Sequence, residues 1–429
     1  MASSGQNRVV ITGMGLSTSL GPDLPACWRR LIAGENGIAP ISFWDPAEYS
    51  TKVAAEARHI PRESGLSGFP GNWCRRTVRL FLPPAAEAVR DAGLDRAPID
   101  AARIGVSIGT SVNYLDVNLL KEYFRMRTPD HKRLDMARFA LEGLQPQNGF
   151  VRRLGDTIAS TTARLFGLGG PATVNDTACA ASAHAIGEAF RMIRRGEATA
   201  MLAGGSTALV SPISILAFAL LGALSRSENP DEASRPFDRM RDGFVMGEGA
   251  GAVVLESLES ALSRGARIHA ELTGFGSTLN AGTLTDPSPD GIPEARAMQL
   301  ALADGATAID EIDYIAAHGT STPKNDPGET VAIKRVFGDH ARRLMVSSNK
   351  GQIGHTISAA GVCNLIFAVQ AMKHDCVPPT MHLHHPDPEC DLDYVPNQSR
   401  SARVRAALVN AFAFGGQNAS LAVRRWSEA

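Results

Sequence analysis

The chain has 429 residues, of which 44% are hydrophobic and 20% are charged, and its 43 basic residues nearly balance 44 acidic ones. This composition is typical of a soluble globular enzyme and excludes a disordered or fibrous chain. A formal net charge of −1 argues against a nucleic-acid-binding protein, because such proteins gather positive charge. The six cysteines are dispersed without a CxxC pair, which favours reduced thiols in a cytoplasmic compartment.

In chain order, short apolar runs alternate with helical segments, a pattern that favours α/β layering. Residues 9–15 (VVITGMG) predict a buried strand, and residues 84–94 predict a helix that starts at Pro84 and ends at Gly93. The glycines of the first strand lack the third glycine of a dinucleotide-binding fingerprint, so we interpret them as tight strand-turn packing positions. Further strands are predicted at residues 104–110, 198–205 and 251–256.

One segment is long enough to be weighed as a membrane span. Residues 198–225 form a run of 28 residues without a charge. Pro212 and the Gly204–Gly205 pair interrupt this run, and no aromatic or basic belt flanks it. We therefore predict a buried strand followed by a buried loop and helix, with no membrane span and no secretory signal at the N-terminus.

The sequence contains a weak internal repeat. Residues 85–111 and 297–321 both contain a helix, a glycine, an Ile-Asp spacer, a strand and a Gly-Thr-Ser tripeptide. This order predicts two similarly built halves whose strand-end loops meet in one site. Residues 112–150 are irregular and charged, and we interpret them as a surface excursion or lid.

Cys179 is the first candidate functional residue. It follows Asp176 and Thr177, which are typical helix-capping residues, and it opens a segment made almost wholly of small residues. A helix N-terminus favours the thiolate form of a cysteine, and small residues let a helix lie tightly inside a core. A nucleophile and a small core residue are equally consistent with this segment alone.

Two histidines favour the nucleophile. His318 follows an apolar strand in a loop of Gly, Thr, Ser and Pro, and His355 lies in a Gly-flanked position before a long buried helix. Lys350 stands five residues before His355, in uncharged surroundings that require a partner, for which Glu329 is a candidate. Each histidine alone is more often a core residue, whereas together with Cys179 they suggest one site.

The sequence also offers a cluster that looks like a zinc site. His382, His384, His385 and Cys390 lie within nine residues of one another. No second Cys/His group has ligand spacing, and two prolines separate the cysteine from the histidines. We therefore predict no metal site.

The motifs in this order resemble the β-ketoacyl-[acyl carrier protein] synthases of type II fatty acid and polyketide synthesis, most closely the synthase II branch. The resemblance covers residues 8–424 and includes DTACAAS, RPFDRMRDGFVMGEGAG, HGTSTPKND, SSNKGQIGHTISAAG and FAFGGQN. It implies a thiolase-like five-layer αβαβα fold, usually dimeric, with two duplicated halves at residues 8–258 and 259–426.

The resemblance also implies roles for individual residues. Cys179 matches the acyl-accepting nucleophile, and His318 and His355 match the two catalytic histidines. The other matches are Lys350 paired with Glu329, Thr320 and Thr322 on the phosphopantetheine arm, and Phe414 as a gate whose backbone N–H completes the oxyanion hole with that of Cys179. The basic docking residues usual in the family are absent before residue 75, so Arg75, Arg76 and Arg79 are candidates for carrier-protein docking.

The implied reaction is a decarboxylative Claisen condensation of malonyl-carrier protein with an acyl group held on Cys179, without a metal or a free cofactor. The implied partners are an acyl carrier protein and a second subunit, identical or related. The alternatives are a ketosynthase of a specialised type II polyketide or unusual-lipid pathway, acting with a non-catalytic chain-length partner, and that partner itself. The catalytic residues disfavour the non-catalytic partner, and the second histidine and the Lys350 motif disfavour a Cys-His hydrolase.

Overall fold

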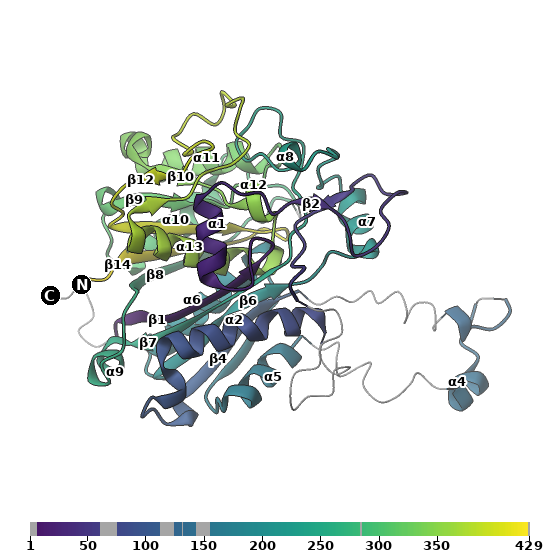
Figure 1. Ribbon diagram of the computed structural model, residues 1–429, viewed down its shortest axis with the longest axis horizontal. Helices are drawn as coiled ribbons and strands as arrows, with labels where there is room; N and C mark the ends of the chain where they lie inside the picture. The colour runs from purple at the N-terminus through teal and green to yellow at the C-terminus, as the bar shows by residue number, and fades with distance from the viewer. Residues whose placement is uncertain are drawn as a thin grey trace.

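The strands of the computed structural model form one large mixed sheet (Figure 1). The structure describes residues 7–60, 75–111, 124–130, 132–142, 155–283 and 285–427. Within them the sheet has ten strands in the order β10-β9-β13-β14-β8-β1-β7-β6-β4-β5. The N-terminal strands are β1 (Val9–Thr18), β4 (Ile104–Thr110), β5 (Ala172–Asn175), β6 (Ala200–Thr207) and β7 (Gly249–Ser257). The C-terminal strands are β8 (Ala270–Leu279), β9 (Ile312–Ala316), β10 (Met345–Ser347), β13 (Ala406–Phe412) and β14 (Gln417–Arg425).

The two sets of strands have the same topology. From the centre of the sheet outward, β1-β7-β6-β4-β5 matches β8-β14-β13-β9-β10 strand for strand in chain order. In both sets the first two pairings are antiparallel and the last two are parallel. Antiparallel pairing of β1 with β8 joins the sets over only three residue pairs. The duplication that the internal repeat predicts is therefore present in the fold.

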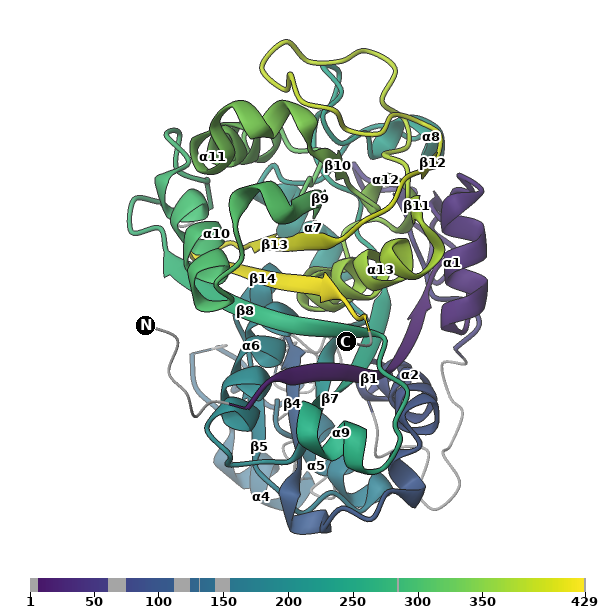
Figure 2. The ribbon, with the colours of Figure 1, turned by 90° about the vertical axis from the view of Figure 1, so that its left-hand side faces the viewer.

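Helices divide the molecule into five layers (Figure 2). Helices α6 (Ala181–Arg194) and α13 (Ala360–His374) contact each other and lie between the two halves of the sheet. Helices α2 (Arg76–Ala92) and α5 (Thr157–Phe166) cover the outer face of the N-terminal half. Helices α10 (Ile292–Asp304) and α11 (Asn325–Phe337) cover that of the C-terminal half. The result is the thiolase-like αβαβα fold.

Paired glycines allow each half of the sheet to lie close to its outer helix. A Cβ atom on Gly13 of β1 would lie 2.2 Å from the carbonyl oxygen of Ala88 in α2. A Cβ atom on Gly274 of β8 would lie 2.1 Å from that of Ala301 in α10. Since real Cβ atoms do not approach oxygen so closely, only glycine fits either position. The glycines are packing positions as predicted, although their neighbour is a helix and not a turn.

Helix α2 differs from its prediction at one end. It ends at Gly93, whose φ of 60° is the expected left-handed cap, but it begins at Arg76, eight residues before the predicted start. Pro83 and Pro84 lie inside the helix. Proline weakens a helix interior, yet Leu80 and Phe81 ahead of the prolines are fully buried, and burial of that apolar surface outweighs the lost hydrogen bonds.

The uncharged segment folds as a strand and a helix, as predicted. Strand β6 is followed by α7 (Pro212–Leu220), a helix of nine residues. In the described parts of the chain, no helix combines the length and the apolarity needed to cross a bilayer. The prediction of a buried helix was wrong, because Ile215 is the only buried residue of α7, and Leu220 is 79% exposed.

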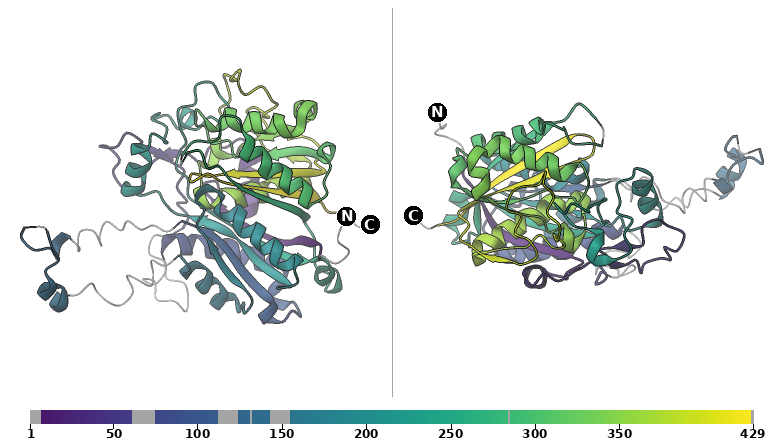
Figure 3. Two further views of the ribbon diagram at one scale, coloured as in Figure 1. Left: turned by 180° about the vertical axis from the view of Figure 1, so that it is seen from behind. Right: turned by 90° about the horizontal axis from the view of Figure 1, so that it is seen from above.

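The predicted excursion lies partly outside the described residues. Its described part contains α4 (Met136–Glu142), which stands away from the body of the molecule in two views (Figure 3). The remaining helices are α1 (Leu24–Ile32), α8 (Pro230–Ala233), α9 (Leu258–Ser263) and α12 (Lys350–Ile353). The described residues also contain two short ladders, β2 (Ala39–Pro40) with β3 (Val53–Ala54) and β11 (Cys376–Val377) with β12 (Arg400–Ser401).

Candidate active site

Cys179 lies in a strained turn at the start of the central helix α6. It belongs to a 3₁₀ turn, Ala178–Ala180, and Ala178 has a φ of 44°, which non-glycine residues rarely adopt. The small residues of α6 let the helix pack directly against β4, β6 and α13, as predicted. The fixed turn holds the Cys179 side chain, which is 5% exposed, at the junction of the two halves.

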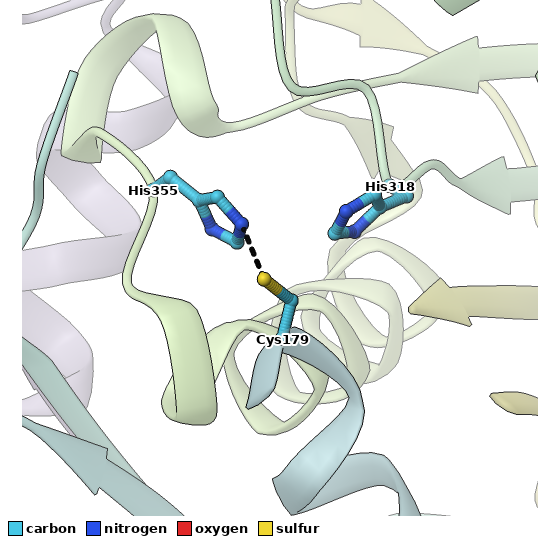
Figure 4. Close-up of side chains that lie close together, drawn as sticks. All are labelled: Cys179, His318 and His355. Carbon is cyan, nitrogen blue, oxygen red and sulfur yellow. Dashed lines mark hydrogen bonds between the residues drawn. The ribbon is translucent and has the colours of Figure 1, made fainter. Parts of the chain in front are cut away.

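His355 contacts the cysteine directly. Its Nε2 atom lies 3.1 Å from Cys179 Sγ (Figure 4), and its Nδ1 accepts a hydrogen bond of 3.2 Å from the Ile357 backbone N–H. A neutral imidazole has one N–H, so an accepting Nδ1 assigns that N–H to Nε2. His355 therefore points a hydrogen-bond donor at the position of Cys179.

His318 also faces Cys179, and like His355 it belongs to the C-terminal half. It follows β9, and its ring centre lies 5.3 Å from that of His355, with the two rings nearly perpendicular (Figure 4). Its Nδ1 atom is buried and has no hydrogen-bond partner. Burial, followed by the positive charge of Lys350, lowers the pKa of both histidines well below the ordinary value. Both rings are therefore neutral at pH 7 and offer N–H groups without a full charge.

Glu329 and Lys350 both hold the backbone of His318. The Glu329 carboxylate accepts hydrogen bonds from the N–H of His318 at 2.9 Å and of Gly319 at 2.8 Å. The Lys350 ammonium donates to the carbonyl oxygen of His318. Lys350 thus contacts the His318 peptide, and Glu329 acts on the lysine through its charge. Burial lowers the pKa of Lys350 to about 8, although Glu329 opposes the shift.

The protonation of Cys179 differs from the prediction. Burial raises the pKa of the thiol to about 11, although Lys350 and the backbone N–H groups of Phe414 and Cys179 act in the opposite direction. The structure thus differs from the expectation of a thiolate at the helix N-terminus, because desolvation exceeds the effect of the helix. Both N–H groups are directed at the sulfur, beside the position that the carbonyl oxygen of an acyl group on Cys179 would occupy.

A cavity of about 280 Å³ connects these residues with the surface. Thr320 and Thr322, whose hydroxyls share a hydrogen bond of 2.9 Å, lie in its wall together with Phe414. Phe414 precedes the Gly415–Gly416 turn between β13 and β14, in which both glycines have a positive φ. Cys179, His318 and His355 also line the cavity. The structure therefore brings the predicted catalytic, arm-binding and gate residues together around one space.

Asp326 is a residue that the sequence reasoning missed. Its carboxylate is fully buried and accepts hydrogen bonds from the backbone N–H groups of Thr320, Ser321 and Phe237. It thereby shapes the loop that carries His318 and Thr320. Its presence in the HGTSTPKND motif, as an acid in the first turn of α11, was the available signal.

The three arginines at the start of α2 differ in their surroundings. Arg76 donates to the buried carboxylate of Glu248 at 2.7 Å and to the backbone carbonyls of Ala57 and Ile60. Its guanidinium is thus engaged in the fold and only 15% exposed, which disfavours its predicted role in docking. Arg75 and Arg79 are partly exposed and remain predicted docking residues.

The histidines and the cysteine of residues 382–390 look like a zinc cluster in the sequence, but in the structure, which describes all of them, they do not form one group of ligand atoms. His382 Nδ1 pairs with the carbonyl oxygen of Ser234 rather than with another of these candidates, whereas Cys390 is buried in the hydrophobic cluster that includes Leu383 and Tyr394. Across the described residues, only Cys179, His318 and His355 place three metal-ligand atoms within 4.8 Å of one another. A metal bound there would occupy the sulfur that the proposed chemistry uses as a nucleophile.

Comparisons with known proteins agree with this geometry. Residues 6–261 match the model of the N-terminal domain of β-ketoacyl synthases, and residues 269–384 match that of the C-terminal domain. The chain is 40% identical over 429 residues to 3-oxoacyl-[acyl-carrier-protein] synthase 2 of Synechocystis, covering 99% of this chain and all of the relative. It is 38% identical over 423 residues to the enzyme of the same name from Staphylococcus aureus, with 99% of each chain covered. The chain belongs to the β-ketoacyl synthase family of condensing acyltransferases.

Solved structures show the same fold over the whole chain. A type II polyketide ketosynthase in complex with its acyl carrier protein has a TM-score of 0.85 and 32% identity, covering 98% of this chain and 100% of that one. The ishigamide ketosynthase/chain length factor has a TM-score of 0.84 and 34% identity, with 99% and 100% coverage. A β-ketoacyl synthase from Burkholderia phymatum has the same score and identity, with 98% and 100% coverage.

Proposed function

We propose that this protein condenses malonyl-carrier protein with an acyl group held on Cys179 and extends the chain by two carbons. The contact between Cys179 Sγ and His355 Nε2, with His318 facing the same point, carries this proposal. It is supported by the curated relatives, which are named 3-oxoacyl-[acyl-carrier-protein] synthase 2. The reaction balances without a metal or a redox cofactor.

In the first step, Cys179 takes the acyl group from a carrier protein. The sulfur attacks the thioester carbonyl, and the resulting oxyanion lies against the backbone N–H groups of Phe414 and Cys179. The intermediate collapses with loss of the carrier thiolate, which receives the proton that the Cys179 thiol gives up. The acyl group is left on a sulfur that is again a good leaving group.

In the second step, malonyl-carrier protein loses CO2. The electron pair of the broken C–C bond moves onto the thioester oxygen, and the N–H groups of His318 and His355 stabilise this enolate. Burial of both rings excludes water that would protonate the carbanion. Lys350 and Glu329 position His318 through its backbone.

In the third step, the carbanion attacks the acyl carbonyl on Cys179. A new C–C bond forms, the Cys179–acyl bond breaks, and the 3-oxoacyl product remains on the carrier. The thiolate takes up one proton from solvent, which restores the starting enzyme. Thr320 and Thr322 hold the carrier's phosphopantetheine arm, and Arg75 and Arg79 attract the acidic carrier.

Replacement of Cys179 by Ala tests the assignment. The wild-type protein, incubated with acyl-carrier protein, gains the mass of the acyl group, and C179A does not. Retention of acyl transfer by C179A would contradict the proposal. H318A and H355A are expected to keep acylation while losing malonyl decarboxylation, and full decarboxylation by both variants would overturn their roles.

A second candidate is a ketosynthase of a type II polyketide pathway that acts as a heterodimer with a chain-length partner. Structural likeness to a type II polyketide ketosynthase and to a ketosynthase/chain length factor favours it, whereas the curated relatives, named 3-oxoacyl-[acyl-carrier-protein] synthase 2, favour the first proposal. Size-exclusion chromatography of the protein expressed alone separates the two. A homodimer that condenses acyl groups by itself supports the first proposal, and an inactive monomer supports the second.

A further inference from the structure

The cavity is lined by two carboxyl groups that the mechanism does not use, those of Asp286 and Glu294, and Glu294 is the buried one. Glu294 lies in the first turn of α10 and is 1% exposed. One of its oxygens, Oε1, accepts a hydrogen bond of 3.3 Å from the Ser288 backbone N–H. The other oxygen, Oε2, is buried without a hydrogen-bond partner, and Glu294 lines the same cavity as Cys179. A buried acceptor without a donor is costly, so this oxygen requires a partner.

The other side chains that line the cavity restrict what that partner is. The hydrophobic cluster around Cys179 is formed by Leu209, Val210, Ile215 and other apolar side chains, and it suits a hydrocarbon chain. The lining of the cavity also contains polar side chains from several elements. These include Asn280, Asp286, Thr320, Thr322, Lys324 and Asn418.

The charge of the site restricts the partner further. Asp286 and Glu294 both present carboxylates, and the one ammonium of this lining, Lys324, lies 2.6 Å from Asp286. A phosphate would be repelled by Glu294, whereas an N–H group would complete its hydrogen bonding. The phosphopantetheine arm of a carrier-bound thioester contains two amide N–H groups, and it passes through this cavity if the thioester reaches Cys179.

We propose that Glu294 Oε2 accepts a hydrogen bond from an amide N–H of the phosphopantetheine arm, so that Glu294 is a positioning residue for carrier-bound substrates. This inference rests on the proposed function, because it requires a thioester delivered to Cys179. It adds to Thr320 and Thr322 a carboxyl acceptor on a separate element, α10.

Three hexanoyl thioesters test the inference through the rate of Cys179 acylation, followed by intact mass. Hexanoyl-pantetheine has two amides, hexanoyl-N-acetylcysteamine has one, and S-ethyl hexanethioate has none. We expect E294A to lower kcat/KM for the pantetheine ester about tenfold, a typical effect of losing a hydrogen bond to a charged group, and to leave the ethyl ester unchanged. If E294A also lowers kcat/KM for the N-acetylcysteamine ester, the contact is to the inner amide. If kcat/KM for that ester is unchanged, the contact is to the outer amide.

Two further variants make the test decisive. E294Q keeps the side-chain volume, but if its oxygen serves Ser288 N–H, its NH2 group faces the arm, so we expect the same selective loss. E259A removes an exposed carboxylate from α9 and is expected to acylate normally from all three esters. An equal loss on all three esters, or no loss in E294A and E294Q, would overturn the inference. Failure of the wild-type protein to accept hexanoyl-pantetheine would instead contradict the proposed function.

Discussion

At the residue scale, Cys179 shows where sequence reasoning stops. Its position after Asp-Thr and before a run of small residues predicts a nucleophile at a helix start, and the structure places it there. Its protonation was predicted wrongly, because the helix effect is visible in the sequence whereas the desolvation that outweighs it depends on residues distant in the chain. The unpaired oxygen of Glu294 is equally invisible in the sequence, since it results from the packing of α10.

The raised pKa of Cys179 predicts a steep pH dependence of its alkylation in the free protein. With a thiol pKa of about 11, the thiolate fraction rises about tenfold per pH unit from pH 6 to 8. Above pH 8 the increase becomes shallower, because Lys350, with a pKa of about 8, loses the charge that favours the thiolate. Iodoacetamide labelling followed by peptide mass spectrometry measures this rate. A plateau that begins at pH 7 or below would contradict the prediction.

Asp326 provides a second prediction at this scale. Asp326 Oδ1 accepts the backbone N–H of Thr320, and Oδ2 accepts those of Ser321 and Phe237. In D326N, an NH2 group replaces one of these two oxygens. We expect the free energy of unfolding to fall by about 3 kcal/mol and the KM for acyl-carrier protein to rise, because a buried charged acceptor is lost and Thr320 shifts. Denaturant unfolding and steady-state kinetics measure the two effects. D310N, which changes an exposed carboxylate, is the control. If the two variants lost the same free energy of unfolding, Asp326 would not be the residue that holds this loop.

At the element scale, the sequence predicted regular strands better than helices that break local rules. Residues 104–110 were predicted as a strand, and β4 has the same bounds. Helix α2 was predicted too short because Pro83 and Pro84 locally favour a start, whereas burial of Leu80 and Phe81 carries the helix through them. The periodicity of one chain segment contains no information about the partner that buries it.

The contact between α6 and α13 offers a test at this scale. A Cβ atom on Gly361 of α13 would lie 2.8 Å from Ala183 of α6, so the two helices must separate in G361A. We expect a loss of about 1–3 kcal/mol in unfolding free energy from overpacking. We also expect slower acylation, because Cys179 and His355 lie in the short segments that lead into these helices. Thermal unfolding and intact-mass kinetics measure both.

Gly328 of α11 is the matched control for Gly361. A Cβ atom there would make only ordinary contacts, the nearest at 3.5 Å from Pro287. G328A is therefore expected to keep or raise the unfolding free energy, since alanine favours a helix over glycine by about 1 kcal/mol. Equal destabilisation by the two substitutions would show that the α6–α13 contact is not the cause.

At the scale of the whole molecule, the catalytic residues come from both halves of a duplicated fold. Cys179 belongs to the N-terminal half, and His318, His355 and Phe414 belong to the other. The Gly-Thr-Ser repeat predicted that strand-end loops meet, but only the second copy lines the cavity, and Ser111 of the first contacts Ser358 beside the His355 loop. The duplication could be predicted from the sequence because both halves repeat the same order of elements. Which half supplies which catalytic residue could not be predicted, because that depends on how the halves pack.

Ion pairs of Glu271 lie where the two halves of the sheet meet. Glu271 of β8 accepts hydrogen bonds from Arg8 at 2.7 and 2.8 Å and from Arg424 at 2.8 Å, where β1 meets β8 over three residue pairs. Burial raises the pKa of Glu271, but the two arginines outweigh it and the net shift is downward. A carboxylate with a lowered folded-state pKa stabilises the fold above its unfolded pKa, and this contribution is lost as the pH falls through the folded value.

We therefore expect E271Q to lower the unfolding free energy by about 1–2 kcal/mol at pH 7, and by progressively less below about pH 4.5 as wild-type Glu271 also becomes neutral. Urea unfolding at pH 7 and pH 3.5 measures the difference, and E259Q, at an exposed carboxylate, controls for the loss of one negative charge. If E271Q were equally destabilised at both pH values, the shape of the side chain and not its charge would hold the two halves together at this point.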